Sequence, residues 1–225
     1  MKILIINPNS NLEMTKAIQT TADNFAKDDF EVVCLSITDA PKFIETYEDA
    51  VRAAPGMMKL VRENEEEFDA FIVACHCDPN LDLLKEITKK PVVGIGEASM
   101  KIASMLGHRF SVVSTVKHSI PNKEVLIRKY HLQEVIASVK APKDELCEAS
   151  DEEKYLQTAK LVIEEDMAEV IVLGCAGMTG LDKRLEQELG VPVLDGVICA
   201  LIIASGLVKY GISTSKIRRY NPEIE

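Results

Sequence analysis

Short apolar runs alternate with longer amphipathic stretches along the chain. In the first half, the runs are rich in Ile and Val and are bounded by Pro, Gly, Asn or Asp, which is typical of buried strands in a parallel sheet. Strands are predicted at residues 2–6, 30–36, 69–74 and 91–95, and helices at 12–27, 48–67, 78–89 and 96–106. Pro55-Gly56 predicts that the second helix is split into two segments, and Pro79 is predicted at the first position of the third.

The same alternation begins again near residue 109. Strands are predicted at residues 109–114, 132–138, 169–173 and 191–194, and helices at 121–130, 151–166, 179–189, 196–210 and, as a short element, from about 214. The third strand of each set ends at a cysteine, Cys75 or Cys175, and the fourth begins with Pro-Val. Pro91 and Pro192 follow these cysteines at nearly the same interval. Together these matches predict an internal duplication.

The duplicated pattern predicts an α/β fold of two pseudo-symmetric lobes, each a four-stranded parallel sheet flanked by helices. The lobes are predicted at residues 1–96 and 97–196, with residues 197–225 packing back on the first lobe. Ligands bind at the carboxyl ends of strands in open α/β sheets, so Cys75 and Cys175 would face each other across one cleft between the lobes. The alternative is a single doubly wound sheet in which the two cysteines end unrelated strands.

Composition and charge narrow the possible partners. Of the 225 residues, 47% are hydrophobic and 28% charged, which is ordinary for a globular protein. The net charge is −10 and no block of Lys or Arg occurs, so we expect no nucleic-acid partner. The longest apolar stretch, residues 197–208, is too short for a membrane span, and the N-terminal residues lack a signal-peptide pattern. We therefore expect a cytoplasmic protein that does not associate with a membrane.

The sequence contains six cysteines, and in the cytoplasm these are expected to be reduced thiols. Cys34 and Cys199 lie in apolar runs and are predicted to act as small hydrophobic side chains. Cys147 lies among acidic residues and is predicted to be a surface thiol. Only Cys75 and Cys175 are expected at strand ends, where the chemistry of such folds takes place.

Two opposed thiols suit proton transfer. A thiolate is a base, and its pKa falls at a helix N-terminus; a helix is predicted to begin shortly after each of Cys75 and Cys175. One thiolate would remove a proton from a carbon acid while the other thiol donates one to the opposite face. The backbone N–H groups of residues 77–78 and 176–177 would stabilise the carbanion. No Gly-x-Gly-x-x-Gly or Walker-type loop occurs, so no cofactor is expected.

Five ordered motifs resemble those of the hydantoin racemases in the aspartate/glutamate racemase superfamily. They are Asn7-Pro8-Asn9-Ser10, Ala74-Cys75-x-x-Asp78-Pro79, Pro91-Val-x-Gly94-Ile-x-Glu97-Ala98, Leu173-Gly-Cys-Ala-Gly-Met178 and Val191-Pro-Val-x-Asp195-Gly196. The resemblance covers nearly the whole chain. It implies a two-lobed α/β fold and cofactor-independent racemisation of a small molecule by two cysteines, which by motif are Cys75 and Cys175. It also implies a homo-oligomer.

The resemblance implies a substrate of the hydantoin type, meaning a 5-substituted hydantoin or allantoin, because the imide next to the reacting carbon delocalises the carbanion. The substrate-binding positions that it implies are Asn7, His76, Cys77, Ser114, Thr115, Ala176 and Gly177. From its sequence context, Asn7 is equally well explained as a turn residue.

The chain departs from the family pattern around the expected pocket. His76 stands where Phe is common, Cys77 where a small residue is usual, Asn80 where Gly is usual, and His118 where we expect Arg. These departures leave open an aspartate/glutamate-type amino-acid racemase or a related cysteine-dependent isomerase or decarboxylase. Outside enzymes, a thiol redox sensor or a ligand-binding protein remains an alternative. The run 75–78 also contains metal-ligating residue types, but its spacing is unlike that of zinc sites, so no metal is expected.

Overall fold

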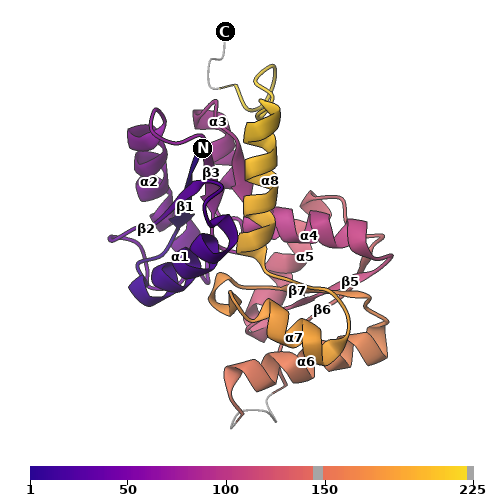
Figure 1. The fold of residues 1–225 in the computed structure, drawn as a ribbon. Helices are drawn as coiled ribbons and strands as arrows, with labels where there is room; N and C mark the ends of the chain where they lie inside the picture. Colours follow the sequence, from indigo (N-terminus) through magenta and orange to yellow (C-terminus); the bar gives the residue numbers. More distant parts are fainter. Residues whose placement is uncertain (144–148, 222–225) are drawn as a thin grey trace.

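The chain folds into two four-stranded parallel sheets with helices on both faces of each (Figure 1). This computed structural model describes residues 1–143 and 149–221. The first sheet has the order β2-β1-β3-β4 and the second β6-β5-β7-β8. The strands are β1 (Lys2–Asn7), β2 (Glu31–Ser36), β3 (Ala70–Val73), β4 (Val92–Gly94), β5 (Phe110–Val113), β6 (Ile136–Lys140), β7 (Val170–Leu173) and β8 (Val193–Leu194).

Strand order is identical in the two sheets once the numbering is shifted by four. β3 and β7 therefore occupy equivalent positions, next to the central strands β1 and β5, and all the strand pairs are parallel. The predicted fold class is confirmed, and the alternative of a single doubly wound sheet is wrong. Cys75 follows β3 and Cys175 follows β7, so the two thiols leave their sheets at the same edge.

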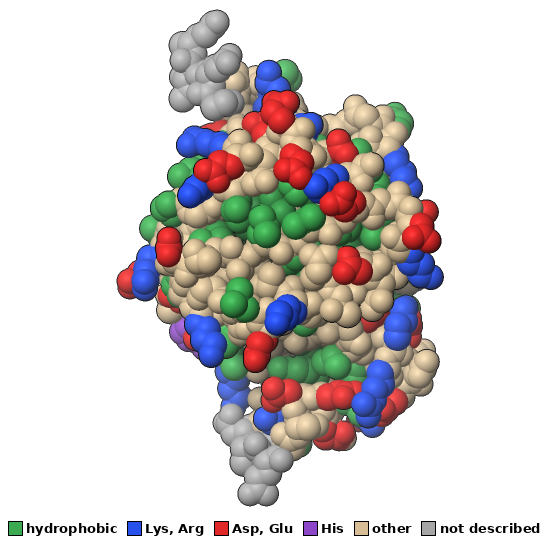
Figure 2. Space-filling view, turned by 60° about the vertical axis from the view of Figure 1, so that its left-hand side comes forward, with side chains coloured by type: hydrophobic (Ala, Val, Ile, Leu, Met, Phe, Trp, Pro, Cys, Tyr) green, Lys and Arg blue, Asp and Glu red, His purple; other side chains and the backbone are tan. Residues whose placement is uncertain are grey.

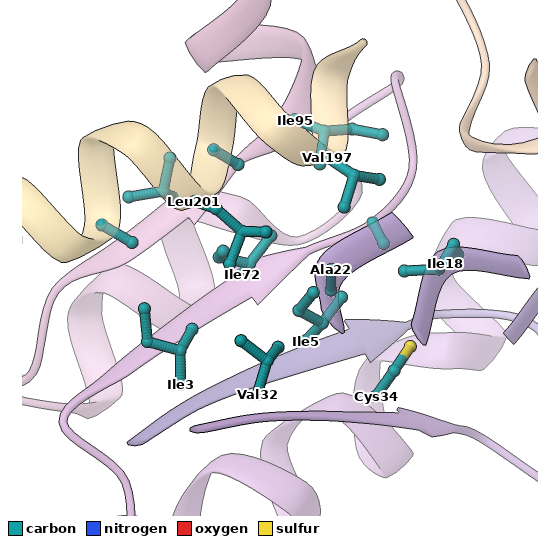
Figure 3. Close-up of a cluster of buried hydrophobic side chains, with 14 of the residues drawn as sticks. Ile3, Ile5, Ile18, Ala22, Val32, Cys34, Ile72, Ile95, Val197 and Leu201 are labelled. Atoms are coloured by element: carbon teal, nitrogen blue, oxygen red, sulfur yellow. The ribbon is translucent and has the colours of Figure 1, made fainter. Parts of the chain in front are cut away.

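The first lobe buries both faces of its sheet, as a parallel sheet requires. Ile3 and Ile5 of β1 point toward α1 (Leu12–Ala26) and α8 (Gly196–Tyr210), where they pack with side chains from both helices (Figure 3). Leu4 and Ile6 point to the other face, which α2 (Tyr47–Asn64) and α3 (Leu81–Ile87) cover. Cys34 and Cys199 belong to the first of these clusters, which confirms them as small core side chains.

The second lobe repeats this arrangement. Its sheet lies between α4 (Ile95–Leu106) and α5 (Ile120–Lys129) on one face and α6 (Asp151–Asp166) and α7 (Asp182–Leu189) on the other. Cys147 lies outside the residues that the structure describes. No helix among the described residues combines the length and the apolar character that crossing a membrane requires.

Two helices join the lobes. α8 packs against α1, β3 and α4, on the first lobe, where residues beyond 196 were expected (Figure 1). α4 takes part in both cores, because Ile95 and Ala98 pack in the first lobe whereas Met100 and Ala103 pack in the second. We therefore propose that the boundary at residues 96–97 lies within an element that both lobes share.

Proline positions account for two wrong helix predictions. α2 is continuous through Pro55, although a split was predicted. Pro55 cannot bond the carbonyl of Val51, but both residues lie on the exposed side of α2, where water reaches that carbonyl. Pro79 is not the first residue of α3, because Asn80 adopts a left-handed conformation with φ of 57° and α3 begins only at Leu81.

Helices predicted in the last quarter of the chain also differ from those observed. A 3₁₀ turn at Ala176–Met178 follows Cys175, and α7 begins at Asp182 instead of residue 179. The short helix predicted from about residue 214 is absent from the described part of the chain, which ends at residue 221. That segment is instead held on α3 by bonds from Lys216 to backbone carbonyls and from Tyr220 to Asp82.

Candidate active site

A cavity of about 360 Å³ lies between the lobes at the carboxyl ends of β3 and β7. The first lobe lines it with Asn9, Met14 and the segment 74–77, and the second lobe with Thr115, Lys123, Tyr155 and the segment 174–177. Cys75 and Cys175 therefore both line this one cavity, each from its own lobe. This is the juxtaposition that the duplicated sequence pattern predicts.

The loop that carries Cys75 is fixed by Asp78 rather than by a helix. The buried Asp78 carboxylate accepts hydrogen bonds from the N–H groups of Gly96 and Glu97, at 3.0 and 2.7 Å, and from the Tyr130 hydroxyl at 2.6 Å. A Cβ atom at Gly94 would lie 2.3 Å from this carboxylate, so only glycine fits there. The loop is thus tied to the start of α4, and the helix predicted to begin at residue 78 begins only at Leu81, further from Cys75 than predicted.

Each cavity thiol accepts a hydrogen bond from the N–H group two residues further along. Gly177 donates to the Cys175 sulfur at 3.3 Å, and Cys77 donates to the Cys75 sulfur. The N–H of Asp78 bonds the carbonyl of Cys75 at 2.9 Å. The N–H groups of Cys77, Asp78 and Gly177 are thus used within the loops, and their predicted role in stabilising a carbanion stays a prediction.

The Cys175 loop is anchored in the corresponding way. Asp195 caps α8 through the Val197 N–H at 2.7 Å, and also accepts from the Thr179 hydroxyl at 2.6 Å and the Gly180 N–H at 2.9 Å. Burial raises the pKa of Cys175, which the hydrogen bond from Gly177 opposes. Cys175 is therefore a protonated thiol at neutral pH.

Two further groups lie beside Cys75 in the cavity, Cys77 from the first lobe and Lys123 from the second. Lys123 comes from α5, is only 2% exposed, and places its Nζ 3.6 Å from the Cys77 sulfur. The Cys75 thiol donates a hydrogen bond to the Cys77 sulfur. This bond, together with burial, raises the pKa of Cys75 well above its usual range. The same hydrogen bond and the Lys123 charge lower the pKa of Cys77 against the opposing effect of burial. Negative charge on this side is thus favoured on Cys77.

His76 forms part of the cavity wall, as we expected. It is 1% exposed, and its Nε2 lies 3.2 Å from the Ser99 hydroxyl of α4. Burial and then the charge of Lys123 lower the pKa of His76 well below its usual range. A neutral imidazole is a poor proton reservoir at neutral pH, so His76 shapes the cavity rather than exchanging protons.

Two of the predicted substrate-binding residues do not line the cavity. Asn7 is fully buried and donates to Asn9 and Thr15, at 2.9 Å each, and so braces the loop after β1. Its neighbour Asn9 lines the cavity instead. Ser114 is also fully buried, and its hydroxyl bonds that of Ser119, whereas His76, Cys77, Thr115, Ala176 and Gly177 do line the cavity. Substrate contact by Asn7 and Ser114 stays a prediction.

Sequence reasoning missed Lys123, although the sequence holds a signal for it. Lys123 stands three, four and seven residues before Leu126, Ile127 and Tyr130, all of which are buried. A lysine in the apolar stripe of a helix must place its ammonium in a polar cavity or beside a counter-charge. Among the described residues, no three or more His, Cys, Asp or Glu side chains are grouped so that they could hold a metal ion.

Known proteins resemble this chain over its whole length. A family model described as Asp/Glu/Hydantoin racemase matches residues 3–204. A hydantoin racemase from Pseudomonas sp. (strain NS671) is 42% identical over 98% of this chain and 91% of its own length. The structure of allantoin racemase from Klebsiella pneumoniae is 33% identical with a TM-score of 0.92, and covers 100% of this chain and 95% of that one.

A second solved structure, allantoin racemase from Pseudomonas fluorescens, is 38% identical with a TM-score of 0.92 and covers 100% of this chain and 98% of that one. These likenesses agree with the two-lobed architecture. The chain belongs to the Asp/Glu/hydantoin racemase family and is a racemase, an isomerase, of that family.

Proposed function

We propose that this protein racemises a hydantoin-type substrate, either a 5-substituted hydantoin or allantoin, by two-base proton transfer between Cys75 and Cys175. The observation that carries the proposal is that both thiols line one cavity at the ends of equivalent strands. The substrate class is supported by relatives named as hydantoin and allantoin racemases. Because the chain is a racemase of this family, the non-enzymatic alternatives are set aside.

The proposed reaction exchanges one proton at each face of the reacting carbon. With one enantiomer, a thiolate at position 75 removes the hydrogen and the Cys175 thiol donates its own proton to the opposite face. With the other enantiomer the roles are reversed, as microscopic reversibility requires. The neighbouring carbonyl and imide groups of the ring delocalise the carbanion. The N–H groups of Cys77 and Gly177 stabilise the two sulfurs whenever either is a thiolate.

An aspartate- or glutamate-type substrate is a second candidate, and Lys123 favours it. The sequence offered no obvious fixed positive charge for a substrate carboxylate, but the structure places the Lys123 ammonium at the cavity. Its contact with Cys77 at 3.6 Å provides that ammonium with a partner inside the protein. For this reason we favour the uncharged hydantoin ring over an amino-acid carboxylate.

Deuterium incorporation tests the proposal. Purified protein is incubated in D₂O with single enantiomers of 5-substituted hydantoins, allantoin, aspartate and glutamate, and optical rotation and isotope content are followed together. We expect a hydantoin or allantoin to lose rotation and gain deuterium at the stereocentre. Cys75→Ser and Cys175→Ser should each slow this reaction severely, whereas Cys199→Ala, in the core of the first lobe, should not.

Two results would contradict the proposal. Racemisation at the wild-type rate by both serine variants would remove the two-thiol mechanism. Exchange with aspartate or glutamate alone would remove the hydantoin assignment and leave the mechanism intact. The homo-oligomer stays a prediction, which light scattering of the same preparation would test.

A further inference from the structure

Lys123 is a buried cation, and its side chain is 2% exposed. Within the described residues no Asp or Glu forms an ion pair with it, and its Nζ hydrogen-bonds only the Cys77 sulfur, at 3.6 Å. A buried ammonium is costly unless an opposite charge is close by. The atom placed to supply that charge is the sulfur of Cys77.

Cys77 also contacts the thiol of Cys75. The two residues belong to one tight turn, closed by the Asp78 N–H on the Cys75 carbonyl at 2.9 Å, and their side chains are hydrogen-bonded. The Cys77 sulfur therefore interacts with the Cys75 thiol and with the Lys123 ammonium at once. All three groups line the same cavity.

We propose that Cys77 and Lys123 form a thiolate–ammonium pair in the resting enzyme, and that this pair accepts the proton of Cys75 so that Cys75 can act as the base. This inference rests on the proposed function, and it gives positioning roles to two residues outside the pair of thiols that face the substrate. The hydrogen bond between the two thiols raises the pKa of Cys75 and, with the charge of Lys123, lowers the pKa of Cys77, in agreement with this geometry.

The three thiols of Cys75, Cys77 and Cys175 account for every proton that moves in the proposed reaction. In the resting state Cys75 and Cys175 are protonated and Cys77 is a thiolate. Transfer of the Cys75 proton to Cys77 makes Cys75 a thiolate, which removes the substrate hydrogen, and Cys175 then donates its proton to the other face. After the turnover Cys75 and Cys77 are protonated and Cys175 is the thiolate. That form either converts the opposite enantiomer or returns to rest when solvent carries the proton from Cys77 to Cys175.

The other titratable groups that line the cavity do not supply this charge. His76 is neutral, and burial raises the pKa of Tyr155, on α6, to about 12, so neither carries charge at neutral pH. The remaining titratable residues that line the cavity are exposed at its rim: Glu45, His118 and Asp151. Cys175 is the remaining deep group, and it lies across the cavity on the second lobe.

The equivalent position in the second lobe has no side chain. Gly177 follows Cys175 by the same two-residue step by which Cys77 follows Cys75, and its N–H makes the equivalent bond to sulfur. Cys175 accordingly has no second thiol beside it in its own turn. The pair therefore makes the two faces of the cavity unequal, with negative charge stored on the Cys75 side.

The test measures thiolate in the free protein, without substrate. Ultraviolet thiolate absorbance and iodoacetamide alkylation are followed across pH, with peptide mapping of the modified cysteine. The variants are Lys123→Met, Lys123→Arg, Cys77→Ser and Cys75→Ser. The matched control is Arg128→Met, which removes a positive charge from the exposed side of the same helix.

At about pH 6, where an ordinary thiol is only about 0.3% ionised, we expect wild type to show one thiolate, mapped to Cys77. Lys123→Met should lower its alkylation rate at least about tenfold, and Cys77→Ser should abolish the signal. Lys123→Arg, Cys75→Ser and Arg128→Met should keep it, because the positive charge or the Cys77 sulfur is retained. If Lys123→Met fails to fold, the comparison of wild type with Cys77→Ser gives the same answer.

Alkylation at pH 6 that maps to Cys75 or Cys175, or that is unchanged in Lys123→Met, would overturn the inference. A variant that keeps the thiolate but weakens binding of a carboxylate substrate would assign Lys123 to the substrate instead, and would overturn it as well. Because these readouts need no turnover, a protein that shows the thiolate but racemises no hydantoin would contradict the proposed function alone. In an active enzyme, loss of the pair must lower kcat/KM equally in both directions, because the equilibrium constant of racemisation is 1.

Discussion

Asp78→Asn tests how the first cysteine loop is held. The Asp78 carboxylate is 4% exposed and accepts three hydrogen bonds, from two N–H groups of α4 and from Tyr130. Burial nevertheless dominates, and it raises the pKa of Asp78 to about 6 from a usual value of 3.8. The protein therefore holds a carboxylate whose ionisation is disfavoured in the folded state.

The raised pKa has a definite consequence for stability. Below pH 3.8 Asp78 is protonated in both the folded and the unfolded chain, so it contributes no pH dependence. Above the folded pKa the chain pays the full cost of ionising a buried carboxyl. A pKa raised from 3.8 to about 6 corresponds to about 3 kcal/mol, so the contribution of Asp78 to the free energy of unfolding should fall by about that amount between pH 4 and pH 6.

Asparagine at position 78 is neutral and removes this pH dependence. It keeps one carbonyl acceptor but leaves one N–H of α4 without its bond, at a cost of about 1–3 kcal/mol. At pH 4 the Asp78 carboxyl is itself protonated in the folded protein and offers, like asparagine, one carbonyl acceptor. Between pH 4 and pH 7 only wild type changes its ionisation, so its unfolding free energy should fall by about 3 kcal/mol relative to that of the variant. Loss of the second acceptor should also loosen the turn that holds Cys75.

Urea unfolding of wild type and Asp78→Asn at several pH values between 4 and 7 measures how the difference in their unfolding free energies changes with pH. The exposed Asp28→Asn serves as the control and should show no comparable change with pH. If the difference in unfolding free energy between wild type and Asp78→Asn is constant from pH 4 to 7, then Asp78 does not titrate in this window. The proposed balance between burial and hydrogen bonding would then be wrong.

Three further substitutions test the scaffold. Gly94→Ala places a Cβ 2.3 Å from the Asp78 carboxylate and should cost several kcal/mol and much of the racemase activity, as unfolding and polarimetry would show. Asp195→Ala removes the cap of α8 and two bonds to the Cys175 loop, so thermal unfolding should report a loss of about 2–3 kcal/mol. Thr46→Ala breaks the capping box with Asp49 on α2 and should cost about 1 kcal/mol without changing kcat.

The strand pattern alone predicts most of the architecture. Runs such as residues 3–6 and 170–173 are apolar at every position because both faces of each sheet are covered, and this signal does not depend on context. The equal placement of Cys75 and Cys175 then follows from the duplicated strand order. α6 and α8 begin and end where the sequence predicts, because Ser150 and Asp195 are clear caps.

Tertiary contacts explain what the sequence pattern does not predict. Pro55 is compatible with a continuous α2 only because it lies on the exposed side of that helix. Which side of the helix faces the solvent is decided by tertiary packing. Asp78-Pro79 looks like a helix start, but the carboxylate bonds α4 instead of capping its own helix. Asn7 is turned into the protein by Asn9 and Thr15, and no local pattern distinguishes that orientation from one facing a substrate.

The duplicated strand order and the difference between Cys77 and Gly177 would contribute to the proposed reaction in different ways. Two-base racemisation requires two groups on opposite faces of one carbon, and equivalent strands in paired lobes bring Cys75 and Cys175 to one cavity. It also requires that one group be a base while the other is an acid, and two identical buried thiols would both stay protonated. In the proposed mechanism, Cys77 and Lys123 beside Cys75, and Gly177 beside Cys175, remove that equivalence. The fold would then set the geometry of the reaction, and the contact between Cys77 of the first lobe and Lys123 of the second would set the position of the charge.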